Sequence, residues 1–267
     1  MELLGRIEEA AVRAGGILLE YQRSGVSVDR KSGHELVTSA DMASERFLRE
    51  TLHLLLPGSS FIGEESWDGT IPEPPFWVVD PLDGTNNYAS SYPIFAVSIA
   101  LVEDDEVSLG CVYDPVRRES FTAARGEGAK LNGQPVSASP AASLGDVLLA
   151  TGFPYGRTPG DPGIDLGVLG HFLGYALGIR RGGSAALDLA YTACGRLGGF
   201  WEEHLNPWDM AAGVLLVREA GGRCAGYDLE PWSLLSGGVV AAGPALFDEV
   251  SGVIGRHQLK RGAEAPL

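Results

Sequence analysis

The chain has 267 residues, of which 45% are hydrophobic, and this is enough for a substantial core in one large domain or in two closely packed halves. A formal net charge of −15 argues against nucleic-acid binding by bulk electrostatics, because such a surface repels the phosphate backbone. The three cysteines have no CxxC spacing, and the chain shows neither a signal peptide nor an apolar run of membrane-spanning length, so we expect a cytoplasmic protein without zinc and without membrane contact.

The first half of the chain is predicted to contain two helices followed by a largely antiparallel sheet. Apolar residues at helical spacing predict helices over 2–22 and 39–56, the second with Thr38 or Ser39 as its N-cap. Residues 31–38 form a polar loop that leads into a short extended piece. Short strands are then predicted at 60–63, 76–79, 95–102, 106–114 and 119–124, with a hairpin turn at 103–106.

After residue 145 helices and strands alternate, which predicts an α/β half. Strands are expected at 146–152, 178–181, 198–203, 221–226 and 237–243, and helices at 163–178, 184–194, 207–220 and from about 244. The proline-rich stretches 69–75 and 156–163 are predicted loops, and the tail 257–267 is expected to fray. We therefore expect a mixed α/β (α+β) chain with a single domain over 1–267, made of an N-terminal α+β half (about 1–145) and a C-terminal α/β half (about 146–260).

The segment WVVDPLDGT places two acids at the end of a strand that is predicted to be buried on both faces. Asp80 stands at the carboxyl end of this strand, where clefts form in layered α/β proteins. Pro81 is expected to stop the strand ladder, so that Leu82 bulges and Asp83 falls near Asp80. Two carboxylates and the Leu82 carbonyl then make an oxygen-rich group that suits Mg²⁺.

Two further residues of the same segment suit an anion. The backbone N–H groups of Gly84 and Thr85, at the start of a possible short helix, can face a phosphate, and the Thr85 hydroxyl can orient a water. An Asp-Gly pair by itself is more often an ordinary turn, so this segment alone does not establish a site.

The other candidate residues have ordinary explanations when each is taken alone. In RRGGSAALDLA, Ser184 can cap a helix and Gly183 permits close approach of a ligand, but a Gly-Ser pair before a helix is common.

Asp41 and Asp209 fall in the first turns of predicted helices, where the helix dipole favours acids, and Asn206 is the predicted N-cap before Asp209. Glu64 and Glu202 each follow an apolar strand and pass as surface acids. If the strand before Glu64 adjoins the strand before Asp80, the acids cluster and repel one another unless a cation lies among them.

Together these segments resemble the inositol monophosphatase family of Mg²⁺-dependent, Li⁺-sensitive phosphatases. The similarity runs through LVTSAD, FIGEES, WVVDPLDGTNNY, RRGGSAALDLA and FWEEHLNPWDMAAG, which covers most of the chain. The ordered combination of GEE, DPLDGT and PWDMAAG is far more specific than a single short motif. The resemblance implies a layered αβαβα sandwich of the inositol monophosphatase and fructose-1,6-bisphosphatase type, and a homodimer.

The resemblance also implies a role for each motif residue. Glu64, Asp80 and the Leu82 carbonyl correspond to a first Mg²⁺ site, and Asp80, Asp83 and Asp209 to a second, with a third, weaker ion that again uses Glu64. Gly84 and Thr85 correspond to the backbone that binds phosphate, and Asp83 to a further substrate contact. Thr85 and Glu64 correspond to the groups that orient the attacking water, and Asp41 to an acid that supports Thr85. The positions that contact the alcohol part of the substrate correspond to Gly183, Ser184, Ala185 and Glu202.

The implied reaction is hydrolysis of a phosphate monoester by in-line attack of a metal-activated water, without a phosphoenzyme. Acids that first bind metal allow an acidic protein to hold an anionic substrate. A myo-inositol monophosphate is favoured, because Glu202 can accept hydrogen bonds from ring hydroxyls. Fructose 1,6-bisphosphate, histidinol phosphate and 3'-phosphoadenosine 5'-phosphate stay open. The bisphosphates call for extra basic residues, for which Arg157, Arg180 and Arg181 are the candidates.

Two readings of a different class also stay open. A non-catalytic regulatory relative is expected to have lost at least one metal-binding acid, but all of the motif acids are present. The other alternative is a protein that only buffers metal ions, but that function does not explain the segment that resembles a phosphate-binding loop.

Overall fold

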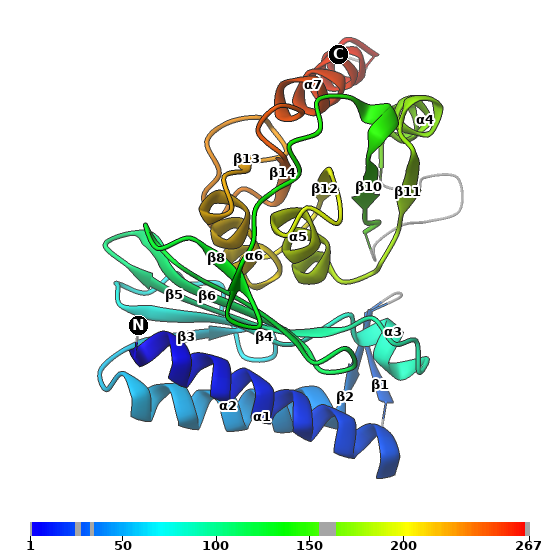
Figure 1. Ribbon diagram of the computed structural model, residues 1–267. Helices are drawn as coiled ribbons and strands as arrows, with labels where there is room; N and C mark the ends of the chain where they lie inside the picture. Colours follow the sequence, from blue (N-terminus) through cyan, green and yellow to red (C-terminus); the bar gives the residue numbers. More distant parts are fainter. Residues whose placement is uncertain (1, 25–27, 33–34, 155–163, 265–267) are drawn as a thin grey trace.

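The computed structural model describes residues 2–24, 28–32, 35–154 and 164–264, and within them it shows two large sheets, a separate two-stranded hairpin and three layers of helices (Figure 1). The helices, in chain order, are α1 (Glu2–Ser24), α2 (Ser39–Leu55), α3 (Thr85–Ala89), α4 (Leu166–Tyr175), α5 (Ala185–Ala193), α6 (Pro207–Glu219) and α7 (Phe247–Glu264). A single 3₁₀ turn, η1, spans Leu144–Asp146 among the described residues.

The larger sheet has seven strands in the order β3-β4-β5-β6-β7-β8-β9. Its strands are β3 (Ser60–Gly63), β4 (Phe76–Asp83), β5 (Ala96–Glu103), β6 (Glu106–Asp114), β7 (Glu119–Ala124), β8 (Ala129–Leu131) and β9 (Gln134–Pro135). β3 and β4 are parallel, and each later pair is antiparallel. The parallel pair brings the carboxyl ends of β3 and β4, and the acids that follow them, to the same edge of the sheet.

The smaller sheet has five strands in the order β11-β10-β12-β14-β13. They are β10 (Leu148–Thr151), β11 (Gly178–Arg180), β12 (Gly199–Glu203), β13 (Arg223–Ala225) and β14 (Gly238–Ala242). β10 runs parallel to β11 and β12, while β14 runs antiparallel to β12 and β13. A separate hairpin of β1 (Val28–Ser32) and β2 (Glu35–Thr38) precedes α2.

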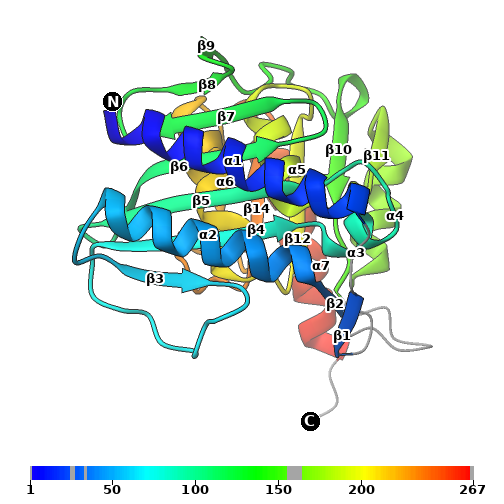
Figure 2. The ribbon, with the colours of Figure 1, turned by 90° about the horizontal axis from the view of Figure 1, so that it is seen from below.

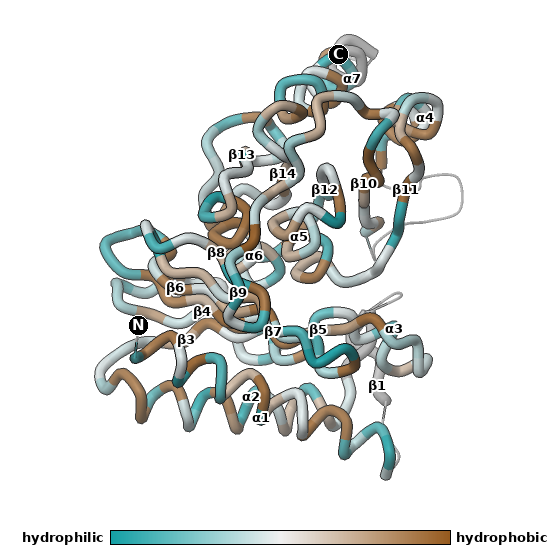
Figure 3. The backbone as a smooth tube through the Cα atoms, in the orientation of Figure 1, coloured by the Kyte–Doolittle hydropathy of each residue, from teal (hydrophilic) through white to brown (hydrophobic). Residues whose placement is uncertain are grey.

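The layers follow one another as helices, sheet, helices, sheet, helices, and this confirms the predicted αβαβα sandwich. α1 and α2 cover the outer face of the seven-stranded sheet, α5 and α6 lie between the sheets, and α4 and α7 cover the other side of the smaller sheet (Figures 1 and 2). Hydrophobic and hydrophilic residues alternate along α1 and α2, as amphipathic helices require (Figure 3). Three buried clusters fill the interfaces. No helix in the described parts of the chain is long and apolar enough to cross a membrane.

The structure corrects several predicted elements. β4 continues to Asp83, so Pro81 does not stop the ladder, and the pairing with β5 resumes after an irregularity. β1, β8 and β9 were not predicted, because short polar strands carry little hydrophobic pattern. The tail is helical as far as Glu264, and α4 is shorter than 163–178. The predicted loop at 156–163 lies outside the described residues.

Candidate active site

The end of β4 places two carboxylates side by side. Asp80 pairs with Ser98 of β5 and Asp83 pairs with Ala96, with the bulge between them. The N–H of Leu82 donates to Asp80 Oδ1 at 2.9 Å, which bends the bulge around the first carboxylate. Both side chains are buried, with exposed fractions of 2% for Asp80 and 8% for Asp83. The predicted proximity of the two acids is thus present, although the strand does not end where we expected.

A third acid joins them from the other half of the chain. Ligand oxygens of Asp80, Asp83 and Asp209 all lie within 4.8 Å of one another, and we call these three residues the acidic cluster. Asp209 stands in the first turn of α6, where Pro207 occupies the first position, and the N–H of Asn206 donates to its Oδ2 at 2.7 Å. The sequence explained Asp209 by the helix dipole alone; the structure adds this capping contact, which orients Asp209 toward Asp80 and Asp83.

Asp83 also links the two halves of the chain. Its Oδ2 accepts hydrogen bonds from the Ser184 hydroxyl at 2.5 Å and from the Ala186 N–H at 2.8 Å. Ser184 is the N-cap of α5, and Ala185 is the first residue of that helix. The N-terminus of α5 therefore points at the acidic cluster, which stabilises negative charge there.

Among the described residues Arg181 is a cation whose charge acts on Asp83, but burial outweighs it and the carboxylates of the cluster still repel one another. Burial raises the pKa of Asp80 well above its usual value, and the charges of Glu64, Asp83 and Asp209 raise it further. Burial also raises the pKa of Asp209 well above its usual range, and Asp83 adds to this effect. Burial raises the pKa of Asp83 to about 6, against the hydrogen bonds from Ser184 and Ala186. A bound cation would remove this repulsion.

Glu64 lies beside the acidic cluster but is not a member of the three-residue group. It follows β3, and its N–H donates to the Val79 carbonyl at 3.3 Å, so the parallel pairing with β4 holds it near Asp80. Its charge contributes to the raised pKa of both Asp80 and Asp209.

The segment after β3 is fixed by α2. Glu45, which is 6% exposed, accepts a hydrogen bond from the Glu65 N–H at 2.9 Å. The same carboxylate pairs with Arg49 at 3.2 Å, and the Arg49 guanidinium also contacts the Ser66 hydroxyl. Sequence reasoning missed Glu45, because a glutamate inside an amphipathic helix gives no signal of a long-range contact.

The Thr85 hydroxyl is held by hydrogen bonds beside the acidic cluster. Its hydroxyl lies 3.1 Å from Asp41 Oδ1 and 3.0 Å from the Leu82 carbonyl oxygen. Asp41 is fully buried in the first turn of α2, where it also accepts hydrogen bonds from the N–H and the hydroxyl of Thr38, the N-cap residue. Burial raises the pKa of Asp41. The expected support of Thr85 by Asp41 is thus a direct hydrogen bond.

Gly84 and Gly183 lie against each other at this point. Gly84 has φ +96°, and a Cβ there would lie 3.0 Å from the Ile94 carbonyl and 3.2 Å from the Gly183 carbonyl. Gly183 has φ +84°, and a Cβ there would overlap the Arg181 guanidinium. Asn87 of α3 donates to the Ile94 carbonyl at 2.7 Å and to the Gly182 carbonyl at 2.9 Å. Both glycines are therefore required by backbone conformation and by the closeness of the two segments.

Three charged side chains from the C-terminal half adjoin the cluster, and we call Arg181, Asp188 and Glu202 the wall group. Burial raises the pKa of Glu202 to about 8, while the charge of Arg181 lowers it. Burial raises the pKa of Asp188 well above its usual value, with a further contribution from Asp83. Glu202 packs so closely on Gly152 that a Cβ at that position would overlap its carboxylate. Sequence reasoning did not single out Asp188, because it reads as one more acid in a helix.

The residues of the acidic cluster fit a divalent cation such as Mg²⁺. They offer hard oxygen ligands at mutually close positions, with the Leu82 carbonyl beside them. In Asp80 and in Asp209, one carboxylate oxygen accepts a hydrogen bond from a backbone N–H. The second oxygen of each carboxylate has no hydrogen-bond donor among the described residues. A bound cation would offset the mutual repulsion of the three carboxylates.

Comparisons with known proteins agree with this geometry. The model of the inositol monophosphatase family matches residues 2–257. The chain is 41% identical over 247 residues to an inositol-1-monophosphatase of a Synechocystis species, covering 91% of this chain and 85% of that one. It is equally 41% identical over 239 residues to Nus factor SuhB of Escherichia coli, covering 88% and 89%. The solved inositol monophosphatase of Anabaena superposes with a TM-score of 0.83, at 37% identity and 95% coverage of both chains.

Proposed function

The chain belongs to the inositol monophosphatase family, and from this membership and the acidic cluster we propose that it is a Mg²⁺-dependent phosphatase of the inositol-1-monophosphatase type. The observation that carries the proposal is the convergence of Asp80, Asp83 and Asp209 beside the N-termini of α3 and α5. A cluster of this kind suits an anionic substrate only when a cation lies between the two.

We assign two or three Mg²⁺ ions to Glu64, Asp80, the Leu82 carbonyl, Asp83 and Asp209. When bound, Mg²⁺ neutralises phosphate charge, lowers the pKa of a water and stabilises the leaving alkoxide. The carboxylates have raised pKa values in the metal-free protein, so part of their protons must leave when the metal binds.

The chain's own groups then position the reactants. Thr85 and Glu64 orient the attacking water, with the Thr85 hydroxyl held by Asp41 and able to accept a proton of that water in a hydrogen bond. The N–H groups of Gly84 and Thr85, which open α3, have no acceptor within the helix and face the phosphate oxygens. No nucleophilic side chain is needed, because the water attacks phosphorus directly.

The substrate's alcohol is assigned to the wall side, next to Gly183, Ser184, Ala185 and Glu202. Glu202 accepts no hydrogen bond from the described residues, so its carboxyl oxygens are available to ring hydroxyls, and with a pKa of about 8 the group is mostly protonated near neutral pH and can also donate a hydrogen bond. This supports a myo-inositol monophosphate as the preferred substrate.

The alternative substrates are distinguished by positive charge. A second phosphate requires a basic partner, and Arg181 is the candidate that adjoins the wall group. Its guanidinium lies 5.5 Å from the Phe153 ring centroid and donates to the Phe153 carbonyl at 3.4 Å. Arg180 instead contacts the neighbouring Ile179 carbonyl, and Arg157 lies outside the described residues. Among the described residues Arg181 is thus the one arginine of this candidate set beside the wall group, and a single arginine supports one phosphate over the two of fructose 1,6-bisphosphate or 3'-phosphoadenosine 5'-phosphate.

A regulatory role is a second candidate, and the observation in its favour is the name Nus factor that a 41% identical relative carries. The two roles are separable, because an acid-to-amide change in the cluster removes hydrolysis while it leaves the outer surface intact. The retained acids favour catalysis, with or without such a second role.

We also propose a cytoplasmic homodimer. Large apolar side chains on α4 and just after it are exposed, namely Leu166, Leu173, Tyr175 and Leu177. Exposed apolar side chains gathered on one element are typical of a protein–protein contact. Sedimentation of the full chain tests this assignment.

The decisive experiment is a phosphatase panel with Mg²⁺. It compares myo-inositol 1-phosphate, fructose 1,6-bisphosphate, histidinol phosphate and 3'-phosphoadenosine 5'-phosphate, each with and without EDTA and Li⁺. We expect the fastest hydrolysis with the inositol phosphate, loss of activity with EDTA and inhibition by Li⁺. Failure to hydrolyse any of the four with Mg²⁺ would overturn the enzymatic proposal.

A further inference from the structure

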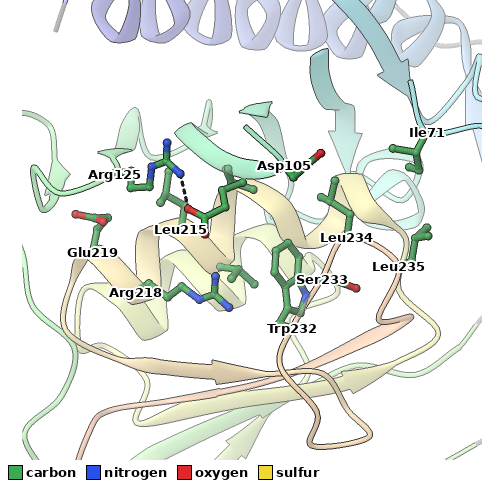
Figure 4. Close-up of a pocket in the computed structure, with 13 residues that line it drawn as sticks. Ile71, Asp105, Arg125, Leu215, Arg218, Glu219, Trp232, Ser233, Leu234 and Leu235 are labelled. Carbon is green, nitrogen blue, oxygen red and sulfur yellow. Dashed lines mark hydrogen bonds and ion pairs between the residues drawn. The ribbon is translucent and has the colours of Figure 1, made fainter. Parts of the chain in front are cut away.

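A second hollow lies near the opposite end of α6 from Asp209, and we call it the α6 pocket (Figure 4). Its walls come from the C-terminal half of α6, the β5–β6 turn, Arg125 after β7, Ile71 before β4, and residues 232–235 before β14. Its volume of about 600 Å³ falls in the range of small-molecule sites. Asp209 and Arg218 are nine residues apart on α6, which is about 13 Å along the axis, so the pocket is separate from the acidic cluster.

The walls are largely apolar. Val107, Leu215, Trp232 and Leu234 line the pocket, and Leu235 at its edge is 67% exposed. Exposure of these apolar side chains to water does not stabilise the fold. A ligand with an apolar body would remove them from water, which is favourable.

Most of the charged groups in the lining already have partners. Glu106 pairs with Arg125, as the dashed line in Figure 4 shows. Glu219 accepts hydrogen bonds from the N–H groups of Gly126 and Gly128, both at 2.9 Å. These two acids are therefore occupied in holding the turn after β7 against α6.

Arg218 is different. Its guanidinium lies over the Trp232 ring, 5.6 Å from the centroid, and no carboxylate or carbonyl of the described residues accepts a hydrogen bond from it. The stacking on Trp232 holds the guanidinium at the pocket, and its N–H groups stay available to donate hydrogen bonds to a ligand. Asp105, the remaining acid of the lining, stands on the sheet side in Figure 4, away from the Arg218–Trp232 pair.

We propose that the α6 pocket binds a small organic carboxylate with an aromatic body. The carboxylate pairs with Arg218, and the body lies against Trp232, Leu215 and Leu234. A planar guanidinium matches a carboxylate with two parallel hydrogen bonds, and the apolar walls accept a ring. Binding at this site is independent of hydrolysis, so it is measurable whether or not the chain is a phosphatase.

The test uses three matched probes on the full chain: 3-phenylpropionate, 3-phenylpropanol and 3-phenylpropylamine. Saturation-transfer NMR and calorimetry measure their affinities. We expect the carboxylate to bind with a Kd of about 1 mM, as befits a fragment, and to bind more tightly than the alcohol and the amine. Arg218→Gln is expected to weaken the carboxylate at least about fivefold and to leave the alcohol within about twofold.

A matched control is Arg223→Gln. Arg223 also lies over an aromatic ring, 4.4 Å from the Phe247 centroid, but it is not part of the pocket and pairs with Asp248. This variant is expected to bind all three probes like the unchanged chain. Leu234→Asp, in the wall, is expected to weaken the carboxylate and the alcohol together. Absence of binding, equal affinity of Arg218→Gln for the carboxylate, or preference for the amine would each overturn the proposal.

Discussion

In the acidic cluster each carboxylate has an oxygen that the protein holds by a hydrogen bond, whereas Glu202 of the wall group accepts none from the described residues. The three acids of the acidic cluster are thus oriented before a metal or substrate binds, whereas the carboxyl group of Glu202 is available to hydrogen-bond a bound substrate. Preorganised groups suit a step that every substrate shares, and a free acceptor suits the choice among substrates. The difference separates the reaction, assigned to the cluster, from specificity, assigned to the wall.

The largest effect is expected at Asp83. Asp83→Asn keeps the shape of the side chain but removes a charge that the metal requires, so the rate of hydrolysis is expected to fall at least about 10³-fold. Initial rates with myo-inositol 1-phosphate measure this, while far-UV circular dichroism checks the fold. Asp146→Asn, an exposed acid in the 3₁₀ turn, is the control and should leave the rate unchanged. Wild-type rates in Asp83→Asn would mean that Asp83 is only a turn residue.

Thr85→Val is expected to have the next largest effect. The hydroxyl that Asp41 holds is lost without a change in volume, and kcat is expected to fall by about 10²-fold with little change in KM. Thr122→Val, a buried threonine of β7, is the matched control. An equal loss in both variants would point to a packing effect and against a role in orienting water.

Glu202→Gln tests the wall side. A lost hydrogen bond between neutral groups is worth about 1 kcal/mol, so kcat/KM for myo-inositol 1-phosphate is expected to fall about fivefold. Phenyl phosphate has no ring hydroxyls, and its kcat/KM should stay within about twofold. An equal fall for both substrates would assign Glu202 to the reaction instead of to specificity.

The stability of the metal-free protein should depend on pH. Folding raises the pKa of Asp83 from 3.8 to about 6 and that of Glu202 from 4.5 to about 8, so between these values the folded chain holds more protons than the unfolded one. Stability in EDTA is therefore expected to fall as pH rises from about 5 to 8, by on the order of 5 kcal/mol. Urea unfolding at both pH values measures this, and Mg²⁺ should restore stability at the higher pH. A rise in stability with pH would contradict the assignment.

The smallest effect is expected at Glu45, which acts through the segment that carries Glu64. Glu45→Ala removes the acceptor of the Glu65 N–H and should raise the Mg²⁺ concentration for half-maximal activity about threefold, with kcat at saturating Mg²⁺ within about twofold. Glu45→Gln keeps an acceptor oxygen and should restore the wild-type value. Equal Mg²⁺ requirements in all three proteins would remove Glu45 from the site.

The sequence by itself determined the elements with strong patterns, and it singled out the three acids that the structure brings together in the acidic cluster. The amphipathic helices, the buried strands and the caps at Thr38, Ser184 and Asn206 follow from local periodicity and local hydrogen bonding, and the structure contains them. The short strands β1, β8 and β9 were not foreseen, because two to five residues with little apolar pattern form a strand only where a neighbour completes the ladder.

Only the tertiary structure decided which of these acids meet. Asp209 satisfies its helix and Asp41 its capping box whether or not a site exists, so local rules cannot distinguish a helix cap from a ligand. The parallel pairing of β3 with β4 and the seating of α5 and α6 between the two sheets bring residues about 130 positions apart into one cluster. Those contacts depend on long-range packing of whole layers, and this is also what brought Glu45, Asp188 and the α6 pocket to light.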